Sequence, residues 1–206
     1  MVLLSLAVGF AWVLAHQVLG GRHRAALVAL AVPALALGWQ EGSDWLLRAQ
    51  YSAAVSEQVG RPVRVDCQRL TGAWVDPTAE LGFVRFGPDG TPDDVARLEY
   101  DACRRLNAWM RSDRQDPPLE QVVAVHVLAH EAEHLAGELN EGVAECRSLQ
   151  RTAALAERLG ASRDQAQELA VTYVRQVYPS MPEAYRSPAC HPGGSLDLAP
   201  DDPAWP

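Results

Sequence analysis

Three residues near the middle of the chain have types and a spacing that suit chemistry on a metal ion. His130 and His134 lie four positions apart, and Glu131 directly follows the first of them. Residues four apart on an α-helix lie one above the other, so both imidazoles can direct a ring nitrogen at one ion. Catalytic zinc takes such histidine ligands, and a neighbouring carboxylate can accept a proton from water. The pattern therefore predicts a zinc site with Glu131 as the general base.

The residues around this motif predict two helices joined at a glycine. Residues 119–129 are rich in apolar side chains and indicate a buried helix that carries the motif. Gly137 follows the motif, where a helix that must reverse needs a residue tolerant of positive φ. Asn140 is a good N-cap for the second helix, which we expect to end near Gly160.

The second helix supplies a candidate third ligand. Glu141 and Glu145 share one face at i and i+4, and a reversal at Gly137 would bring that face over the histidines. We favour Glu141 as the third zinc ligand, with Glu145 one turn deeper as an acceptor for the outer nitrogen of a ligand histidine. The two acids can exchange these roles. His126 extends the histidine row, but three consecutive members of that row span about 12 Å, which favours a supporting role for His126.

The sequence HEAEHLAGELNEGVAE resembles the zincin metallopeptidases, which share the motif H-E-x-x-H. Its EGVAE segment is similar to the E-x-x-A-D/E pattern of the gluzincins. This resemblance implies a small, mainly helical domain that hydrolyses peptide or protein substrates. It also implies that Glu141 is the third zinc ligand and that Glu145 is the acid that follows it in the family pattern.

Three readings of the motif stay open. The first is a membrane-anchored zinc metallopeptidase in which Glu131 activates water. The second is a catalytically inactive zincin-like domain that binds zinc structurally or binds a partner, and the charge of Glu133 inside the motif favours it. In the last of them no metal is bound, and His130 and His134 are polar helix residues neutralised by the surrounding acids. A structural site is closed by a fourth protein ligand, whereas a catalytic site keeps one position open. Four side chains are candidates for an oxyanion donor: Tyr173, Tyr178, Tyr185 and His191.

Charge and cysteine content narrow the class of protein. The net charge of -8 argues against a nucleic-acid partner, because such proteins carry a basic face. The cysteines are widely spaced without a C-x-x-C pair, and an even number permits two disulfides in an exported domain. Three pairings are open among Cys67, Cys103, Cys146 and Cys190.

The first forty residues predict attachment to the cell membrane. Residues 2–20 are almost wholly apolar, and a second apolar run covers residues 25–39. Arg22 and Arg24 lie between them, and the positive-inside rule places these arginines in the cytoplasm. We expect a transmembrane helical hairpin over residues 1–40, with an anchor plus a signal-like segment as the alternative. Both place the remaining chain on the exoplasmic side.

We expect a linker helix over residues 41–61, a zincin-like metal-binding domain over 62–190 and an irregular tail over 191–206. Within the domain, β-prone runs between residues 62 and 90 predict a short β-hairpin.

Two further helices are predicted inside the domain. Thr91-Pro92-Asp93-Asp94 is typical of a helix start and predicts a helix to about Ser112. Ser162 and Gln165 form a capping box for a last helix that ends near Val177. The fold class is therefore mainly α with a small β element.

Overall fold

Residues 44–68, 81–201 and 205 are described by the computed structural model of the chain. The chain divides into two compact units, Met1–Leu47 and Arg48–Pro206. The described residues form five helices, a small three-stranded sheet and two short 3-10 turns, so the predicted mainly helical class is confirmed. Among them, no helix is long and apolar enough to cross a membrane, and the predicted hairpin at 1–40 lies outside the described residues.

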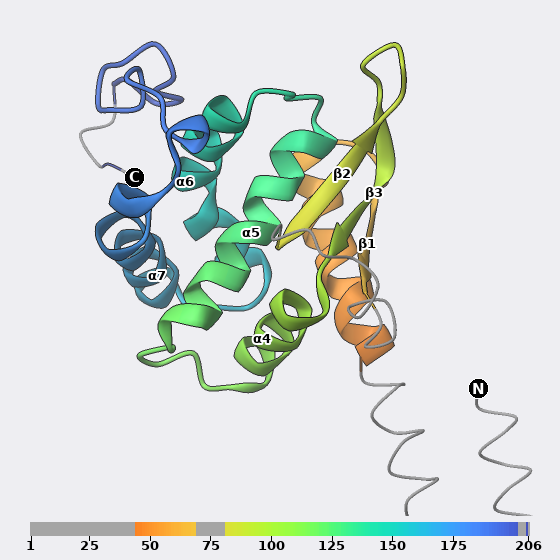
Figure 1. The fold of residues 1–206 in the computed structure, drawn as a ribbon. Helices are drawn as coiled ribbons and strands as arrows, with labels where there is room; N and C mark the ends of the chain where they lie inside the picture. The colour runs from red at the N-terminus through yellow and green to blue at the C-terminus, as the bar shows by residue number, and fades with distance from the viewer. Residues whose placement is uncertain (1–43, 69–80, 202–204, 206) are drawn as a thin grey trace, which may run out of the picture. The chain divides into compact units, whose positions relative to one another are not determined.

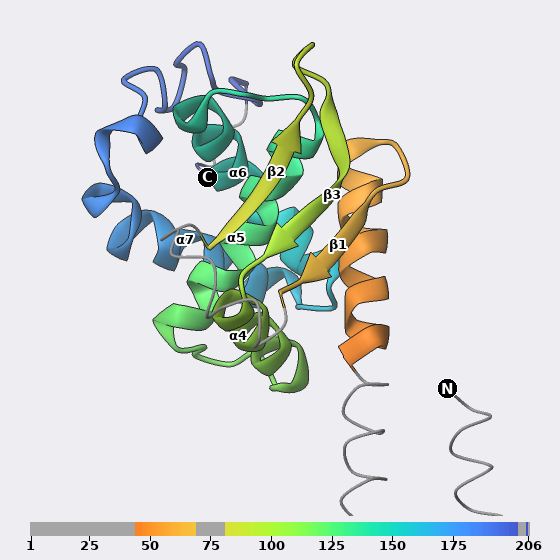
Figure 2. The same ribbon diagram turned by 45° about the vertical axis from the view of Figure 1, so that its right-hand side comes forward.

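Helix α5, Leu119–Leu135, lies at the centre of the described fold (Figure 1). From Val122 onward it is buried around almost its whole circumference, which is the pattern of a core helix rather than a surface one. Three helices pack around it: α4 (Tyr100–Arg111), α6 (Glu141–Arg158) and α7 (Arg163–Gln176). The sheet crosses the remaining side of α5 (Figure 2), so any polar group on this helix must find its partners inside the protein.

The connection between α5 and α6 has the predicted form. Gly137 has φ of +100°, and its N–H donates to the carbonyl of His134 at the end of α5. The Asn140 side chain then accepts from the backbone N–H of Val143 at 3.0 Å and caps α6. These local signals turn the chain back on itself within a few residues. The capping box at the start of α7 is also confirmed.

The strands are β1 (Arg64–Cys67), β2 (Gly82–Phe86) and β3 (Pro92–Leu98), in the spatial order β1-β3-β2. β1 is parallel to β3, while β2 and β3 form an antiparallel hairpin, so the β-hairpin predicted within residues 62–90 uses a later segment as its second strand. β2 is thus an outer strand of this sheet, and it packs against α5 (Figure 2).

The helix predicted to start at Thr91 is wrong over its first part. Pro92–Leu98 is the central strand β3, and α4 begins only at Tyr100. Val95 and Leu98 fall within the predicted helix, but they are buried residues of β3, which pairs with β1 on one edge and with β2 on the other. Pairing on both edges outweighs the local preference of the Pro-Asp-Asp start for a helix.

The remaining core comes from the helix over residues 44–59, whose Tyr51 and Val55 are fully buried. The Tyr51 hydroxyl donates to the Asn107 side chain of α4 at 2.6 Å. The structure contains two disulfides, which confirms the expected number and settles the pairing that the sequence left open. Cys67–Cys103 joins β1 to α4, and Cys146–Cys190 joins α6 to the C-terminal segment.

Candidate metal centre

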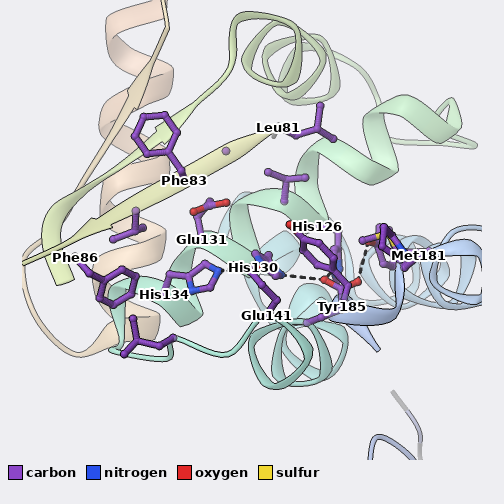
Figure 3. A pocket seen from close by; sticks show the side chains of 17 residues that line it. Leu81, Phe83, Phe86, His126, His130, Glu131, His134, Glu141, Met181 and Tyr185 are labelled. Carbon is purple, nitrogen blue, oxygen red and sulfur yellow. Dashed lines mark hydrogen bonds and ion pairs between the residues drawn. The ribbon is translucent and has the colours of Figure 1, made fainter. Parts of the chain in front are cut away.

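Three side-chain atoms converge at the turn between α5 and α6 (Figure 3). The Nε2 atoms of His130 and His134 lie 3.0 Å apart, and Glu141 Oε2 lies 3.0 Å from the first and 3.3 Å from the second. Ligands about 2.0–2.1 Å from a tetrahedral zinc ion are themselves about 3.3 Å apart. The spacing therefore fits a zinc-sized ion, and these residues are three that the sequence predicted as ligands.

The outer nitrogens of both histidines already have acceptors. His130 Nδ1 donates to Glu145 Oε2 at 2.9 Å, and His134 Nδ1 donates to the backbone carbonyl of Glu138 at 2.6 Å. A neutral imidazole has one N–H, so donation from Nδ1 leaves a lone pair on Nε2. When both imidazoles are neutral, as metal ligands must be, two such lone pairs and the carboxylate oxygen of Glu141 face one another, which is an arrangement that attracts a cation.

Glu145 is fully enclosed and holds its position through several hydrogen bonds. Its Oε2 accepts from His130 and also from His126 Nε2 at 3.1 Å, and its Oε1 accepts from the Tyr173 hydroxyl at 2.9 Å. The Tyr173 ring stacks on His126 with centroids 3.5 Å apart. The structure thus places Glu145 behind His130, where an acceptor fixes the tautomer and orientation of a ligand histidine.

A second group that could hold an ion shares one of these histidines. His126, His130 and Glu145 also present ligand atoms within 4.8 Å of one another. His126 and Glu145 are each 1% exposed, and their facing atoms already make the hydrogen bonds just described. All members of both groups line the cavity, but the Glu141 side chain is 40% exposed, so we take the group that contains it as the candidate metal centre.

Glu131 lies beside this centre, on the side of the sheet (Figure 3). Its carboxylate is packed against the backbone of Gly82 in β2: a Cβ on Gly82 would lie only 2.8 Å from Glu131 Oε1. The absence of a side chain at Gly82 therefore leaves room for the carboxylate. Nothing in the local sequence around Gly82 indicates this contact, because the two residues belong to different elements.

Glu133 points away from the centre and has a structural role. Both of its carboxylate oxygens accept from Arg151 Nη1 of α6, at 2.8 and 2.9 Å, and Gln58 donates to it at 3.1 Å. Its side chain is 1% exposed. The charge inside the motif is therefore neutralised by a partner on α6 and does not enter the cavity.

The acids around the histidines control their protonation. Burial alone would lower the pKa of His130, but hydrogen bonds with Glu141 and Glu145 outweigh it and raise that pKa to about 10. Hydrogen bonds from His130 and His134 in turn lower the pKa of Glu141 to about 2. The His130 imidazole thus keeps both of its ring protons at neutral pH unless a metal ion displaces one of them.

A cavity of about 600 Å³ opens in front of the three converging atoms. Its walls come from β2, α5, the start of α6, Tyr173 of α7 and the segment that follows the 3-10 turn Tyr178–Ser180. That segment contributes Met181, Pro182 and Tyr185, the last of which belongs to the second 3-10 turn, Glu183–Tyr185. The volume is typical of sites that bind small molecules or short segments of chain. The cavity gives a ligand direct access to the metal centre and to Glu131.

The oxyanion-donor candidates occupy different surroundings. Tyr185 lines the cavity with its ring centroid 5.7 Å from that of His130. Tyr173 also borders the cavity, but its hydroxyl donates to Glu145. His191 is exposed, and neither it nor Tyr178 is among the described residues that line the cavity. Tyr185 is thus the candidate best placed to reach a ligand.

No protein-family model, curated protein or solved structure matches the chain. A function must therefore be argued from the chemistry of the site.

Proposed function

We propose that the chain is a zinc-dependent metallopeptidase of the zincin type. The observation that carries this proposal is the convergence of His130, His134 and Glu141 at an open cavity beside Glu131. Two imidazole nitrogens and one carboxylate oxygen form a ligand set that suits zinc. The described residues supply three ligand atoms rather than four, which supports a catalytic role over a closed structural site.

The residues of the chain have distinct roles in the proposed hydrolysis. Bound zinc would polarise the scissile carbonyl and lower the pKa of water. Glu131 would accept a proton from the attacking water on a carboxylate oxygen as the water oxygen joins the carbonyl carbon. It would then deliver that proton to the nitrogen as the C–N bond breaks. Tyr185 would donate its hydroxyl hydrogen bond to the oxygen that becomes negative.

The position of β2 supports a polypeptide substrate. Leu81, Gly82, Phe83, Val84 and Phe86 all line the cavity, so this outer strand runs along it. An outer strand offers backbone N–H and C=O groups that can pair with an extended chain. A peptide bound in this way would cross the metal centre.

We also propose that the N-terminal residues anchor the enzyme in the cell membrane, with its second unit on the exoplasmic side. The apolar runs within residues 1–40 support the anchor. The disulfides support an oxidising compartment, because such bonds persist outside the cytosol.

Metal content and turnover of the purified full-length chain test the proposal. We expect one zinc ion per chain in the wild type and in Glu131→Gln, and little in His130→Ala. Hydrolysis of unstructured peptides should be lost in both variants. Glu120→Gln is a matched control, because Glu120 lies on the same helix but is exposed at its first turn.

Each alternative gives a different result. Zinc binding without hydrolysis by the wild type would support the inactive, structural-zinc domain instead. Hydrolysis that persists in Glu131→Gln would exclude Glu131 as the base. Absence of bound metal in the wild type would refute both zinc-binding readings.

A further inference from the structure

Building on the proposed function, we infer that the cavity takes an internal segment of polypeptide with apolar side chains on both sides of the bond to be cut. The inference rests on what lies at each end of the cavity and on the charges that line it. It therefore describes an endopeptidase with a preference for apolar residues.

The metal centre lies between two groups of largely apolar side chains (Figure 3). At one end, the Phe86 ring meets the His134 ring edge-on, with centroids 6.1 Å apart. At the other end, Tyr185 lies beside His130, and Met181 lies near it in the same wall. A chain that crosses the centre would thus place a side chain against an apolar surface on each side.

The charges that line the cavity argue against binding of a chain terminus. None of the described residues that line it is an arginine or a lysine, so away from the metal centre these residues offer no guanidinium or ammonium group to a C-terminal carboxylate. Arg85 and Arg97 lie nearby, but they contact the Phe83 ring, at 5.7 and 6.0 Å from its centroid, and do not line the cavity.

The acids that line the cavity are already engaged or have an assigned role. Glu141 faces the two histidines, Glu145 accepts hydrogen bonds from His126, His130 and Tyr173, and Glu131 is the proposed base. No further acid among the described lining residues could receive an N-terminal ammonium group. A segment without terminal charges fits this lining best, because an unpaired charge in an apolar cavity is costly.

Short internally quenched peptides, capped at both ends, test the inference with the zinc-loaded full-length chain. The first peptide carries apolar residues on both sides of the target bond, and two others carry aspartate on one side or the other. We expect each aspartate to lower kcat/KM by about tenfold or more, since it removes the burial of an apolar side chain. Uncapped versions should gain nothing from a free terminus.

Variants at the two ends of the cavity test which wall is responsible for the preference for apolar residues. Phe86→Ala should weaken the preference on one side of the bond and Met181→Ala on the other, while Leu119→Ala, an exposed position on α5, should change neither. Phe86→Leu replaces Phe86→Ala if the latter does not fold. Fluorescence anisotropy of labelled peptides on Glu131→Gln gives a reading that needs no turnover, and the apolar peptide should bind about tenfold more tightly than the aspartate peptides.

The outcomes separate this inference from the proposed function. Rapid cleavage of the aspartate peptides, or a clear preference for uncapped ends, would refute the inference while the chain remained a peptidase. Failure to cleave any peptide under zinc-replete conditions would refute the proposed function and the inference with it.

Discussion

Replacement of Gly82 by alanine would test whether Glu131 must lie against β2 in order to act as a base. The new Cβ would lie 2.8 Å from Oε1 and 3.0 Å from Cγ of Glu131, whereas ordinary contacts begin at about 3.4 Å. The carboxylate would have to move by about 0.6 Å (3.4 − 2.8) or more. Glu131 is only 3% exposed, so neighbouring atoms or movement into the cavity must accommodate this shift.

A displacement of this size is large for a catalytic group. A misplacement of about 1 Å can lower a rate about 100-fold, so we expect Gly82→Ala to lower kcat about 10- to 100-fold, or about 1.4–2.7 kcal/mol in activation free energy. Zinc content should not change, because Glu131 is not one of the three converging ligands. Peptide hydrolysis and metal analysis on the same preparation measure both quantities.

Gly87→Ala is the matched control for this variant. Its Cβ would also lie 2.8 Å from a carboxylate oxygen, that of Asp89, but this carboxylate is in the exposed β2–β3 turn and can move aside. We expect near wild-type turnover. If Gly82→Ala were as active as Gly87→Ala, the close packing of Glu131 on β2 would have no bearing on turnover.

Two variants and one change of pH test the interactions that hold the site in place. Arg151→Ala should lower the free energy of unfolding by about 2–3 kcal/mol, since it leaves the buried carboxylate of Glu133 with one remaining donor while water reaches the half-exposed arginine site. Removal of the Cys146–Cys190 bridge should lower stability by up to about 4 kcal/mol and raise KM, because the bridge ties to α6 the segment that continues from Tyr185 in the cavity wall. For the metal-free chain, the raised pKa of His130 gives stabilisation that is complete below pH 6.5 and lost as pH rises through about 10.

Urea denaturation measures the three changes in stability, and peptide hydrolysis measures the change in KM. Each variant has a matched comparison. Arg147→Ala breaks the more exposed pair with Glu138 and should cost less than about 1 kcal/mol. Removal of Cys67–Cys103 should lower stability without a change in KM, since that bridge joins β1 to α4. Three results would contradict these expectations. They are equal losses of unfolding free energy in the two arginine variants, equal KM values in the two bridge variants, and a metal-free chain whose stability increases as the pH rises above 6.5.

The convergence of His130, His134 and Glu141 could be predicted from the sequence because its signals are local. The spacing of His130 and His134 defines one helix face, and Gly137 and Asn140 mark where the chain must reverse and start again. Such signals act within a few residues of one another, so they do not depend on the rest of the fold. The placement of Glu141 follows from them.

The features that the sequence did not predict depend on distant partners. β3 has a helix-like start, and only its pairing with β1 and β2 makes it a strand. Gly82 and Glu131 lie in different elements, and Tyr173 and Glu145 are 28 positions apart, so each contact joins residues that are distant in sequence. No periodicity or cap reports such contacts, because they exist only once the layers have packed.

The three converging side chains all belong to residues 130–141, and this closeness affects how the protein can assemble. Closure of so short a loop costs little conformational entropy, whereas the sheet requires pairing across longer separations. An ion that binds these three side chains would therefore stabilise the α5–α6 turn before the strands pair, and the turn would then act as a folding nucleus. The same short segment, moved to another pair of antiparallel helices, would carry all three converging side chains with it.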